Sequence, residues 1–222
     1  MDPDVARGAA VAEAVALVDP AMALGLGSGR AVFALAELIG ARHPGMRVAV
    51  ASDRTAEVAR AAHLDVRDPD ELGRLDLVLD GADEIDPDLN LLKGGGAALL
   101  REKLLVEQAD RFVVVAERSK LVARLGERMP LPVEVVAFGW RETRARLLEL
   151  VPSAELRREP SRTDEGHRIL DCAIPVSGDL GVLASALKLV TGVVEHGLFL
   201  GLAQRAILGS DDGSVLTRSR GA

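Results

Sequence analysis

Acidic residues follow an apolar segment near the middle of the chain. The stretch LDLVLDGADEID (75–86) predicts a buried strand that ends at Asp80, with Asp83 and Glu84 just beyond it. In open α/β sheets, ligands bind outside the carboxyl ends of the strands. Carboxylates that share a site raise one another's pKa, which suits proton transfer. We therefore expect a functional site that contains Asp80 and Asp83.

Two other interpretations of these acids stay open from the residues alone. Hard cations prefer clusters of oxygen ligands, so a Mg²⁺ site competes with a proton-transfer site. Acids in a solvated turn are the simplest interpretation, and we expect it to hold for Asp86 and Asp88.

A lysine and three glycines come next, at Lys93, Gly94, Gly95 and Gly96. Consecutive glycines cost backbone entropy and offer no side chains for packing. They indicate a loop whose amides approach a ligand closely, and Lys93 places a positive charge beside that loop.

The predicted helix after the glycines (96–109) carries Arg101, Glu102 and Lys103 in its middle. At about 100° per residue, three consecutive charges sweep roughly 200° of the helix surface, and leucines occupy much of the rest. At least one charge should therefore face a partly buried cleft, where a carboxylate would become more basic. Glu102 is the candidate for this position, and a partly exposed ion pair with Arg101 or Lys103 is the alternative.

A second glycine-rich turn, GLGSGR (25–30), lies between a predicted strand and a predicted helix. A dinucleotide fingerprint would need Gly or Ala where Arg30 stands, and the Lys-Ser/Thr ending of a nucleotide-binding loop is absent. Backbone N–H groups, Ser28 and Arg30 could instead bind a phosphate-sized anion. A tight turn without a ligand is the alternative. Asp53, after the next strand, is expected to be a helix N-cap.

Composition argues against several classes of protein. The net charge is -7, and no basic cluster is interleaved with aromatic residues, so we expect no nucleic-acid partner. The single cysteine, Cys172, allows no internal disulfide and is expected to be a buried structural thiol, consistent with a reducing cytoplasm. The N-terminal residues fit neither a signal peptide nor a membrane span, so we expect a cytosolic protein without a membrane partner. The four histidines show no metal-ligand spacing.

Strand and helix patterns alternate through the first half of the chain. Helices are predicted at 4–18, 31–40, 54–63 and 96–109, and strands at 22–29, 47–52, 75–83 and 111–117. This alternation predicts an α/β fold with a mostly parallel, doubly wound sheet. Aromatic residues make up only 2% of the chain, and a core of Val, Leu, Ile and Ala suits such a sheet.

The pattern changes after Gly126. A strand within 129–140 is followed by a helix (143–151), two strands (154–158 and 168–174), a helix (179–190) and a strand (193–195). This β-α-β-β-α-β order predicts a smaller ferredoxin-like α+β domain. We expect one domain at 1–126, a second at 127–199, and a tail at 200–222 that packs back onto the first.

Several motifs, in order and at their spacing, closely resemble type A ribose-5-phosphate isomerases over essentially the whole chain. They are DGADEID (80–86), LLKGGGAALLREK (91–103), VVVAERSKLVARLG (113–126), PLPVEVVAFGW (130–140), TDEGHRILDC (163–172) and GVVEHGLFLGLA (192–203). The resemblance implies a cofactor-free aldose–ketose isomerase of the non-oxidative pentose phosphate pathway, which interconverts D-ribose 5-phosphate and D-ribulose 5-phosphate. It also implies a Rossmann-like first domain, no metal site, and a homodimer or possibly a homotetramer.

The resemblance also implies roles for individual residues. Glu102 matches the catalytic base, and Lys120 matches a substrate-contacting lysine. The family's acidic substrate-binding loop is matched by Asp80, Gly81, Ala82 and Asp83. Its second substrate loop is matched by Lys93, Gly94, Gly95 and Gly96. The first glycine loop departs from the family pattern T-G-S-T, because this chain has Ser28, Gly29, Arg30 and Ala31 there, and Glu117 stands where the family often has Asp.

A mechanism follows as an expectation. Glu102 would move a proton from C2 to C1, and Asp80 or Asp83 would handle hydroxyl protons and ring opening. Lys93 and the glycine amides would stabilise an enediolate. Candidates for phosphate or hydroxyl contacts are Ser28, Arg30, Arg7 and Lys120. A sugar-phosphate-sensing module and a CoA-transferase-like enzyme are the alternatives, and the first would need no base at Glu102.

Overall fold

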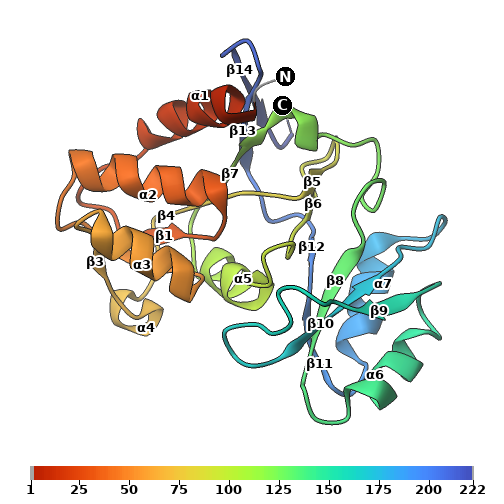
Figure 1. Ribbon diagram of the computed structural model, residues 1–222. Coiled ribbons are helices and arrows are strands. Elements are labelled where there is room, and N and C mark those ends of the chain that lie inside the picture. The colour runs from red at the N-terminus through yellow and green to blue at the C-terminus, as the bar shows by residue number, and fades with distance from the viewer. Residues whose placement is uncertain (1–2, 222) are drawn as a thin grey trace.

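The largest sheet in the computed structural model, which describes residues 3–221, has seven strands (Figure 1). Its strand order is β14-β13-β7-β4-β1-β2-β3. The bounds are β1 (Leu24–Leu26), β2 (Arg47–Val50), β3 (Asp65–Val66), β4 (Leu77–Asp80), β7 (Phe112–Glu117), β13 (Arg205–Gly209) and β14 (Val215–Ser219). All neighbouring strands in it are parallel except β13 and β14. The predicted mostly parallel α/β sheet is therefore confirmed.

Helices pack on both faces of this sheet. They are α1 (Pro3–Val15), α2 (Arg30–Arg42), α3 (Asp53–Ala61), the short α4 (Pro69–Leu72) and α5 (Leu99–Glu107). Because side chains alternate along a strand, Leu77 and Leu79 of β4 join the core under α1 and α2, whereas Val78 joins the core on the α5 side. Strands buried on both faces explain the continuous apolar runs in the sequence.

A second, antiparallel sheet lies at residues 131–196. It contains β8 (Leu131–Val135), β9 (Ala154–Leu156), β10 (Arg168–Cys172) and β11 (Val193–His196), in the order β11-β8-β10-β9. Helices α6 (Trp140–Leu147) and α7 (Leu180–Lys188) pack on it, and Cys172 is buried in their shared core. This is the predicted ferredoxin-like arrangement of strands and helices.

A small third sheet was not predicted. It joins β5 (Glu84–Ile85), β6 (Leu91–Leu92) and β12 (Leu198–Phe199) in the order β12-β6-β5, and a short 3₁₀ helix (Arg118–Lys120) follows β7. Two-residue strands are too short to show a period in the sequence. We propose the domain division 1–126 and 127–199, with 200–222 returning to the first domain, because β13 in this tail pairs with β7.

Two local predictions were wrong. Asp53 is the first residue of α3, and the N-cap is Ser52, whose Oγ accepts a hydrogen bond from the Thr55 N–H. Asp86 is buried rather than solvated, because its carboxylate accepts hydrogen bonds from the backbone N–H groups of Asp88 and Asn90 inside a turn.

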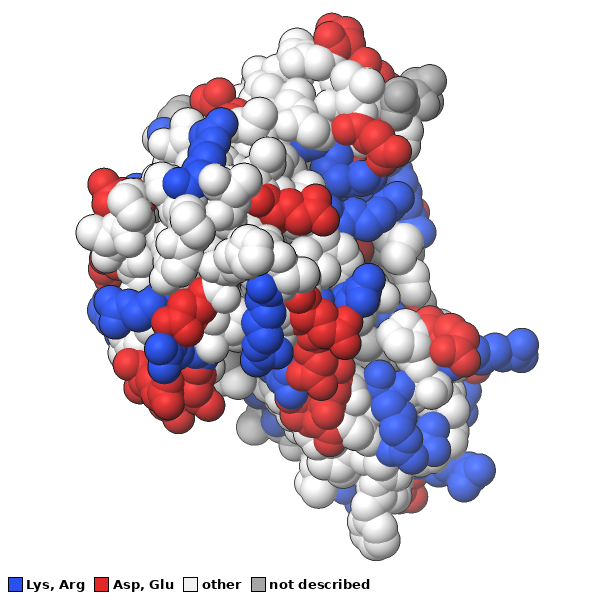
Figure 2. All heavy atoms as spheres, turned by 60° about the vertical axis from the view of Figure 1, so that its left-hand side comes forward, with Lys and Arg blue, Asp and Glu red and all other residues white. Residues whose placement is uncertain are grey.

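The surface carries both signs of charge. Figure 2 shows acidic and basic side chains interspersed over one face of the molecule. Within residues 3–221, no helix is both long enough and apolar enough to cross a membrane.

Candidate active site

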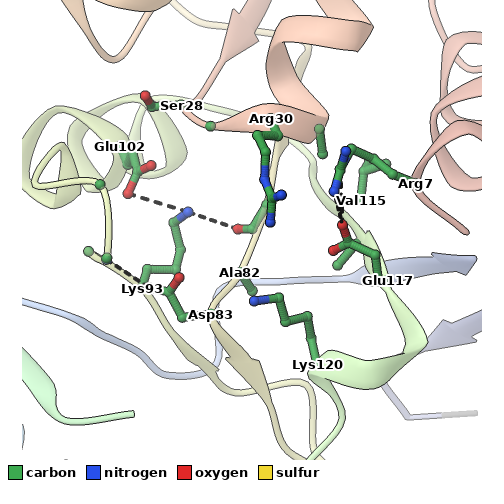
Figure 3. Close-up of a pocket in the computed structure, with 17 residues that line it drawn as sticks. Arg7, Ser28, Arg30, Ala82, Asp83, Lys93, Glu102, Val115, Glu117 and Lys120 are labelled. Atoms are coloured by element: carbon green, nitrogen blue, oxygen red, sulfur yellow. Dashed lines mark hydrogen bonds and ion pairs between the residues drawn. The ribbon is translucent and has the colours of Figure 1, made fainter. Parts of the chain in front are cut away.

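A pocket of about 250 Å³ opens at the carboxyl ends of β1, β4 and β7 (Figure 3). It lies where the strand order reverses between β1 and β4, the usual ligand position in doubly wound sheets. Its lining residues are Arg7, Ser28, Gly29, Arg30, Ala31, Gly81, Ala82, Asp83, Lys93, Gly94, Gly95, Gly96, Glu102, Val115, Ala116, Glu117 and Lys120. All predicted site residues except Asp80 therefore line one pocket.

Asp80 lies underneath the pocket. Its side chain is fully buried, and its carboxylate accepts hydrogen bonds from the backbone N–H groups of Gly81 (2.7 Å) and Ser28 (3.2 Å). A Cβ at position 27 would lie 1.8 Å from the Asp80 Cγ, so only glycine fits there. Gly27 thus lets the loop after β1 close over the carboxylate of β4.

Lys93 connects Asp80 with the pocket. Its Nζ lies 2.8 Å from the Asp80 carboxylate, donates to the Gly81 carbonyl at 2.8 Å, and lies 3.3 Å from Oε2 of Glu102. Burial acts to lower the pKa of Lys93, but the facing carboxylates of Asp80 and Glu102 raise it above its ordinary value. Lys93 is therefore a permanent cation between two buried carboxylates.

Glu102 sits in the first turn of α5, with only 4% of its surface exposed. Burial raises the pKa of Glu102 to about 8, the Asp80 charge adds to this effect, and Lys93 opposes it. Burial also raises the pKa of Asp80, against the action of Lys93 and of the Gly81 and Ser28 N–H groups. A carboxylate with a pKa near neutrality can both take up and release a proton at physiological pH.

The other two charges of the triplet point elsewhere. Lys103 is buried and donates to the carboxylate of Glu195 at 2.8 Å and to the carbonyls of His196 and Leu198. Arg101 pairs with Asp53, Asp164 and Glu165. The predicted alternative, an ion pair between Glu102 and Arg101 or Lys103, was wrong because each of these cations has acidic partners in other segments.

Asp83 occupies the pocket side of the acidic loop. Its Oδ2 accepts a hydrogen bond from the Gly95 N–H at 2.7 Å, which ties the acidic loop to the triglycine loop. Gly94 has a φ of +106°, and a Cβ there would lie 2.7 Å from the Leu99 side chain, so this turn needs glycine.

Positive side chains surround the remainder of the pocket. Figure 3 shows Arg30, at the start of α2, and Lys120, at the end of the 3₁₀ helix, approaching from opposite sides. Arg7 lies at the rim and forms an ion pair with Glu117 at 2.8 Å. Ser28 lines the pocket, and its hydroxyl is 2.9 Å from that of Ser52.

The sequence did not predict that Val115, Ala116 and Glu117 line the pocket, nor that Glu117 pairs with Arg7. Their position at the carboxyl end of β7, next to β4 in the sheet, was the available signal. Among residues 3–221, no group of three or more His, Cys, Asp or Glu side chains is placed to hold a metal ion.

The doubly wound sheet and the charged pocket at its switch point define an α/β protein with a site for a small polar ligand at the carboxyl edge of the sheet. Residues 47–213 match the family model of ribose 5-phosphate isomerase A (phosphoriboisomerase A). The chain is 44% identical to ribose-5-phosphate isomerase A of Thermomicrobium roseum, over 99% of this chain and 97% of the relative. It is 45% identical to that of Roseiflexus sp., over 97% of this chain and 96% of the relative.

Solved structures agree with these relatives. A D-ribose-5-phosphate isomerase in complex with phospho-erythronic acid superposes with a TM-score of 0.93 at 30% identity, over 99% of this chain and all of the other. Ribose 5-phosphate isomerase A from Neisseria gonorrhoeae gives a TM-score of 0.91 at 28% identity, over 97% of this chain and 96% of the other. The chain belongs to the ribose 5-phosphate isomerase A family, and it is a pentose-phosphate isomerase.

Proposed function

We propose that this pocket interconverts D-ribose 5-phosphate and D-ribulose 5-phosphate through an enediolate, with Glu102 as the base that moves the proton. The observation that carries the proposal is the buried Glu102 carboxylate, 3.3 Å from the Lys93 ammonium at the bottom of an anion-binding pocket. The base and the cation that stabilises the resulting negative charge are thus neighbours.

The reaction moves a carbonyl group from C1 to C2. The open-chain aldose has a weakly acidic hydrogen on C2, because the neighbouring carbonyl stabilises the carbanion as an enediolate. Glu102 removes this proton, and the electron pair moves onto the carbonyl oxygen. The proton of the C2 hydroxyl passes to the C1 oxygen through Asp83, and the protonated Glu102 returns its proton to C1, which leaves the ketone at C2.

The negative charge on oxygen needs donors that are already in place. Lys93 is held by Asp80 and the Gly81 carbonyl, so its ammonium needs little rearrangement when charge develops. The N–H groups of the triglycine loop add neutral donors. Asp83 lines the pocket and Asp80 does not, so we assign hydroxyl proton transfer and ring opening to Asp83, and the positioning of Lys93 to Asp80.

The phosphate group would bind at the other end of the pocket. Arg30 and Lys120 provide cations, Arg7 adds a third at the rim, and the N-terminus of α2 provides backbone N–H groups. A related D-ribose-5-phosphate isomerase was solved in complex with phospho-erythronic acid. That complex supports the proposal that the pocket of this chain accepts a phosphorylated sugar. Arg30 and Ala31 stand where the family pattern has two hydroxyl residues. In this chain the charge of Arg30 would take the place of those two hydroxyl donors to the phosphate.

The test is an isomerase assay on D-ribose 5-phosphate with and without a chelator, followed by turnover in D₂O. We expect activity that the chelator leaves unchanged, and deuterium from solvent in the product. A product free of solvent deuterium would point to direct hydride transfer. A sugar-phosphate sensor, the alternative from the sequence, would bind the substrate without turnover. The homodimer, with a homotetramer as alternative, stays a prediction that light scattering can test.

A further inference from the structure

A side chain from the second sheet reaches the triglycine loop. Arg157 directly follows β9, and only 9% of its side chain is exposed. Its Nη1 donates hydrogen bonds to the carbonyl oxygens of Gly94 at 2.7 Å and Gly95 at 3.2 Å. Both glycines line the active-site pocket, but Arg157 does not.

The guanidinium is fixed from its other edge. Its Nε donates to Oδ2 of Asp171 at 2.9 Å, and its Nη2 donates to Oδ1 of the same carboxylate. Asp171 lies inside β10, which is paired on both sides with other strands. A two-point arginine–carboxylate contact defines the plane of the guanidinium as well as its position. Arg157 is therefore a rigid extension of the second sheet.

Peptide geometry relates these carbonyls to the pocket. The peptide bonds within the triglycine loop are trans, so the C=O and the N–H of one peptide unit point in opposite directions. Because Arg157 binds the Gly94 carbonyl, the Gly95 N–H of the same unit points away from Arg157, and it meets Asp83 at 2.7 Å. Because Arg157 also binds the Gly95 carbonyl, the Gly96 N–H points away from it as well.

The Gly96 amide has no acceptor among the residues that the structure describes. Gly96 lines the pocket, and its backbone forms the middle of a turn that the Ala97 N–H closes onto the Gly94 carbonyl at 3.0 Å. Glycine backbones rotate easily, so a turn of three glycines has little preference of its own for the direction of these amides. At the Gly94–Gly95 peptide unit the contact of Arg157 adds to those of Asp83 and Ala97, and at the Gly95–Gly96 unit the Arg157 contact supplies the preference.

We propose that Arg157 is a positioning residue for isomerisation, which holds the Gly95 and Gly96 peptide units so that their N–H groups face Asp83 and the substrate oxygens. The inference rests on the proposed function of the pocket and adds that the second domain takes part in it. Arg157 touches no substrate; it acts through the direction of two backbone amides. Donors fixed before charge develops contribute most to transition-state stabilisation, so loss of Arg157 should affect kcat more than substrate binding.

The experiment compares Arg157→Met with Arg144→Met. Arg144 is a matched control, because its guanidinium also binds a backbone carbonyl, that of Ala154, and a carboxylate, that of Glu155, but neither of these partners lines the pocket. For both variants kcat and KM are measured, together with the affinities for phospho-erythronic acid and for inorganic phosphate by calorimetry. The carboxylate of phospho-erythronic acid is planar and carries delocalised charge, as an enediolate does, whereas phosphate tests only the other end of the pocket.

We expect Arg157→Met to lower kcat by about 10- to 100-fold, less than the loss of an oxyanion donor itself, with KM changed by no more than about threefold. Affinity for phospho-erythronic acid should fall by about tenfold or more while affinity for phosphate stays within about twofold. Arg157→Lys keeps a cation and should recover part of kcat. Arg144→Met should leave all four quantities near those of the unmodified chain.

Unchanged kcat and phospho-erythronic acid affinity in Arg157→Met would overturn the inference. Equal losses for both ligands, or equal losses in Arg144→Met, would also overturn it, because they indicate a general structural role. If Arg157→Met does not fold, Arg157→Lys is judged by the same comparison of ligands. An unmodified chain that fails to isomerise ribose 5-phosphate would contradict the proposed function alone, because the ligand comparison needs no turnover.

Discussion

The Glu102 carboxylate and the Lys93 ammonium lie 3.3 Å apart, and both side chains are almost fully buried. Glu102 comes from the first turn of α5, whereas Lys93 comes from the loop before it and is anchored by Asp80 at the end of β4. Burial makes the glutamate a better base, and the lysine keeps its charge beside it.

Activity should depend on the ionisation of Glu102. Burial and the Asp80 charge raise the pKa of Glu102 to about 8, and a general base acts only when deprotonated. We expect kcat/KM to rise with pH between about 6 and 8 and to level off above that range. The measurement is a pH profile of initial rates on ribose 5-phosphate. A profile that is flat between pH 6 and 9 would contradict this assignment.

Replacing Lys93 by methionine should lower kcat and shift that profile. Lys93→Met removes the cation that we propose stabilises the oxyanion, and we expect this to cost about 10²- to 10³-fold in kcat. It also removes the charge that lowers the pKa of Glu102, so the remaining activity should rise at a higher pH than in the unmodified chain. Lys188→Met is the control, because this partly exposed lysine pairs with Glu195 outside the pocket. A loss of kcat without any shift in the profile would disagree with the role of Lys93 beside Glu102.

The cation at Arg30 should contribute to substrate binding. We expect Arg30→Ala to raise KM by about tenfold with kcat within about threefold, on the scale of one charge-assisted hydrogen bond to phosphate. Arg47→Ala, an exposed arginine at the start of β2, should leave KM unchanged. Steady-state kinetics at two salt concentrations measures both variants. If the two variants behave alike, Arg30 does not bind the phosphate.

As pH rises, the free energy of unfolding should fall while the activity rises. Between the ordinary pKa of 4.5 and about 8, the folded chain keeps a proton on Glu102 that the unfolded chain has released. The free energy of unfolding therefore falls across this window as pH rises. Glu102→Gln lacks this loss, so denaturant unfolding should show it gaining stability relative to the unmodified chain from pH 5 to pH 8. Glu107→Gln, on the exposed surface of the same helix, should show no such trend.

The sequence predicted the two domains' fold types and most of the pocket loops, because these depend on local periodicity and on the carboxyl edge of a parallel sheet. It could not separate Asp80 from Asp83, since both follow the same strand. Their different positions depend on Gly27, which admits the Asp80 carboxylate beneath the loop after β1. That contact joins residues 53 positions apart.

Helix geometry predicted at least one buried charge at 101–103, and the structure buries two of the three. Lys103 is the second buried charge, and it contacts Glu195 and two backbone carbonyls from β11 and β12. Arg157 gave no signal at all, because its partners are carbonyl oxygens about 60 positions earlier in the chain and a backbone acceptor leaves no trace in a sequence.

The turnover of Glu102→Gln tests the central claim most directly. The substitution keeps the size of the side chain and removes its basicity, so kcat should fall by about two to four orders of magnitude. Circular dichroism and inorganic phosphate binding should match the unmodified chain. A kcat close to that of the unmodified chain would contradict the assignment of Glu102 as the base.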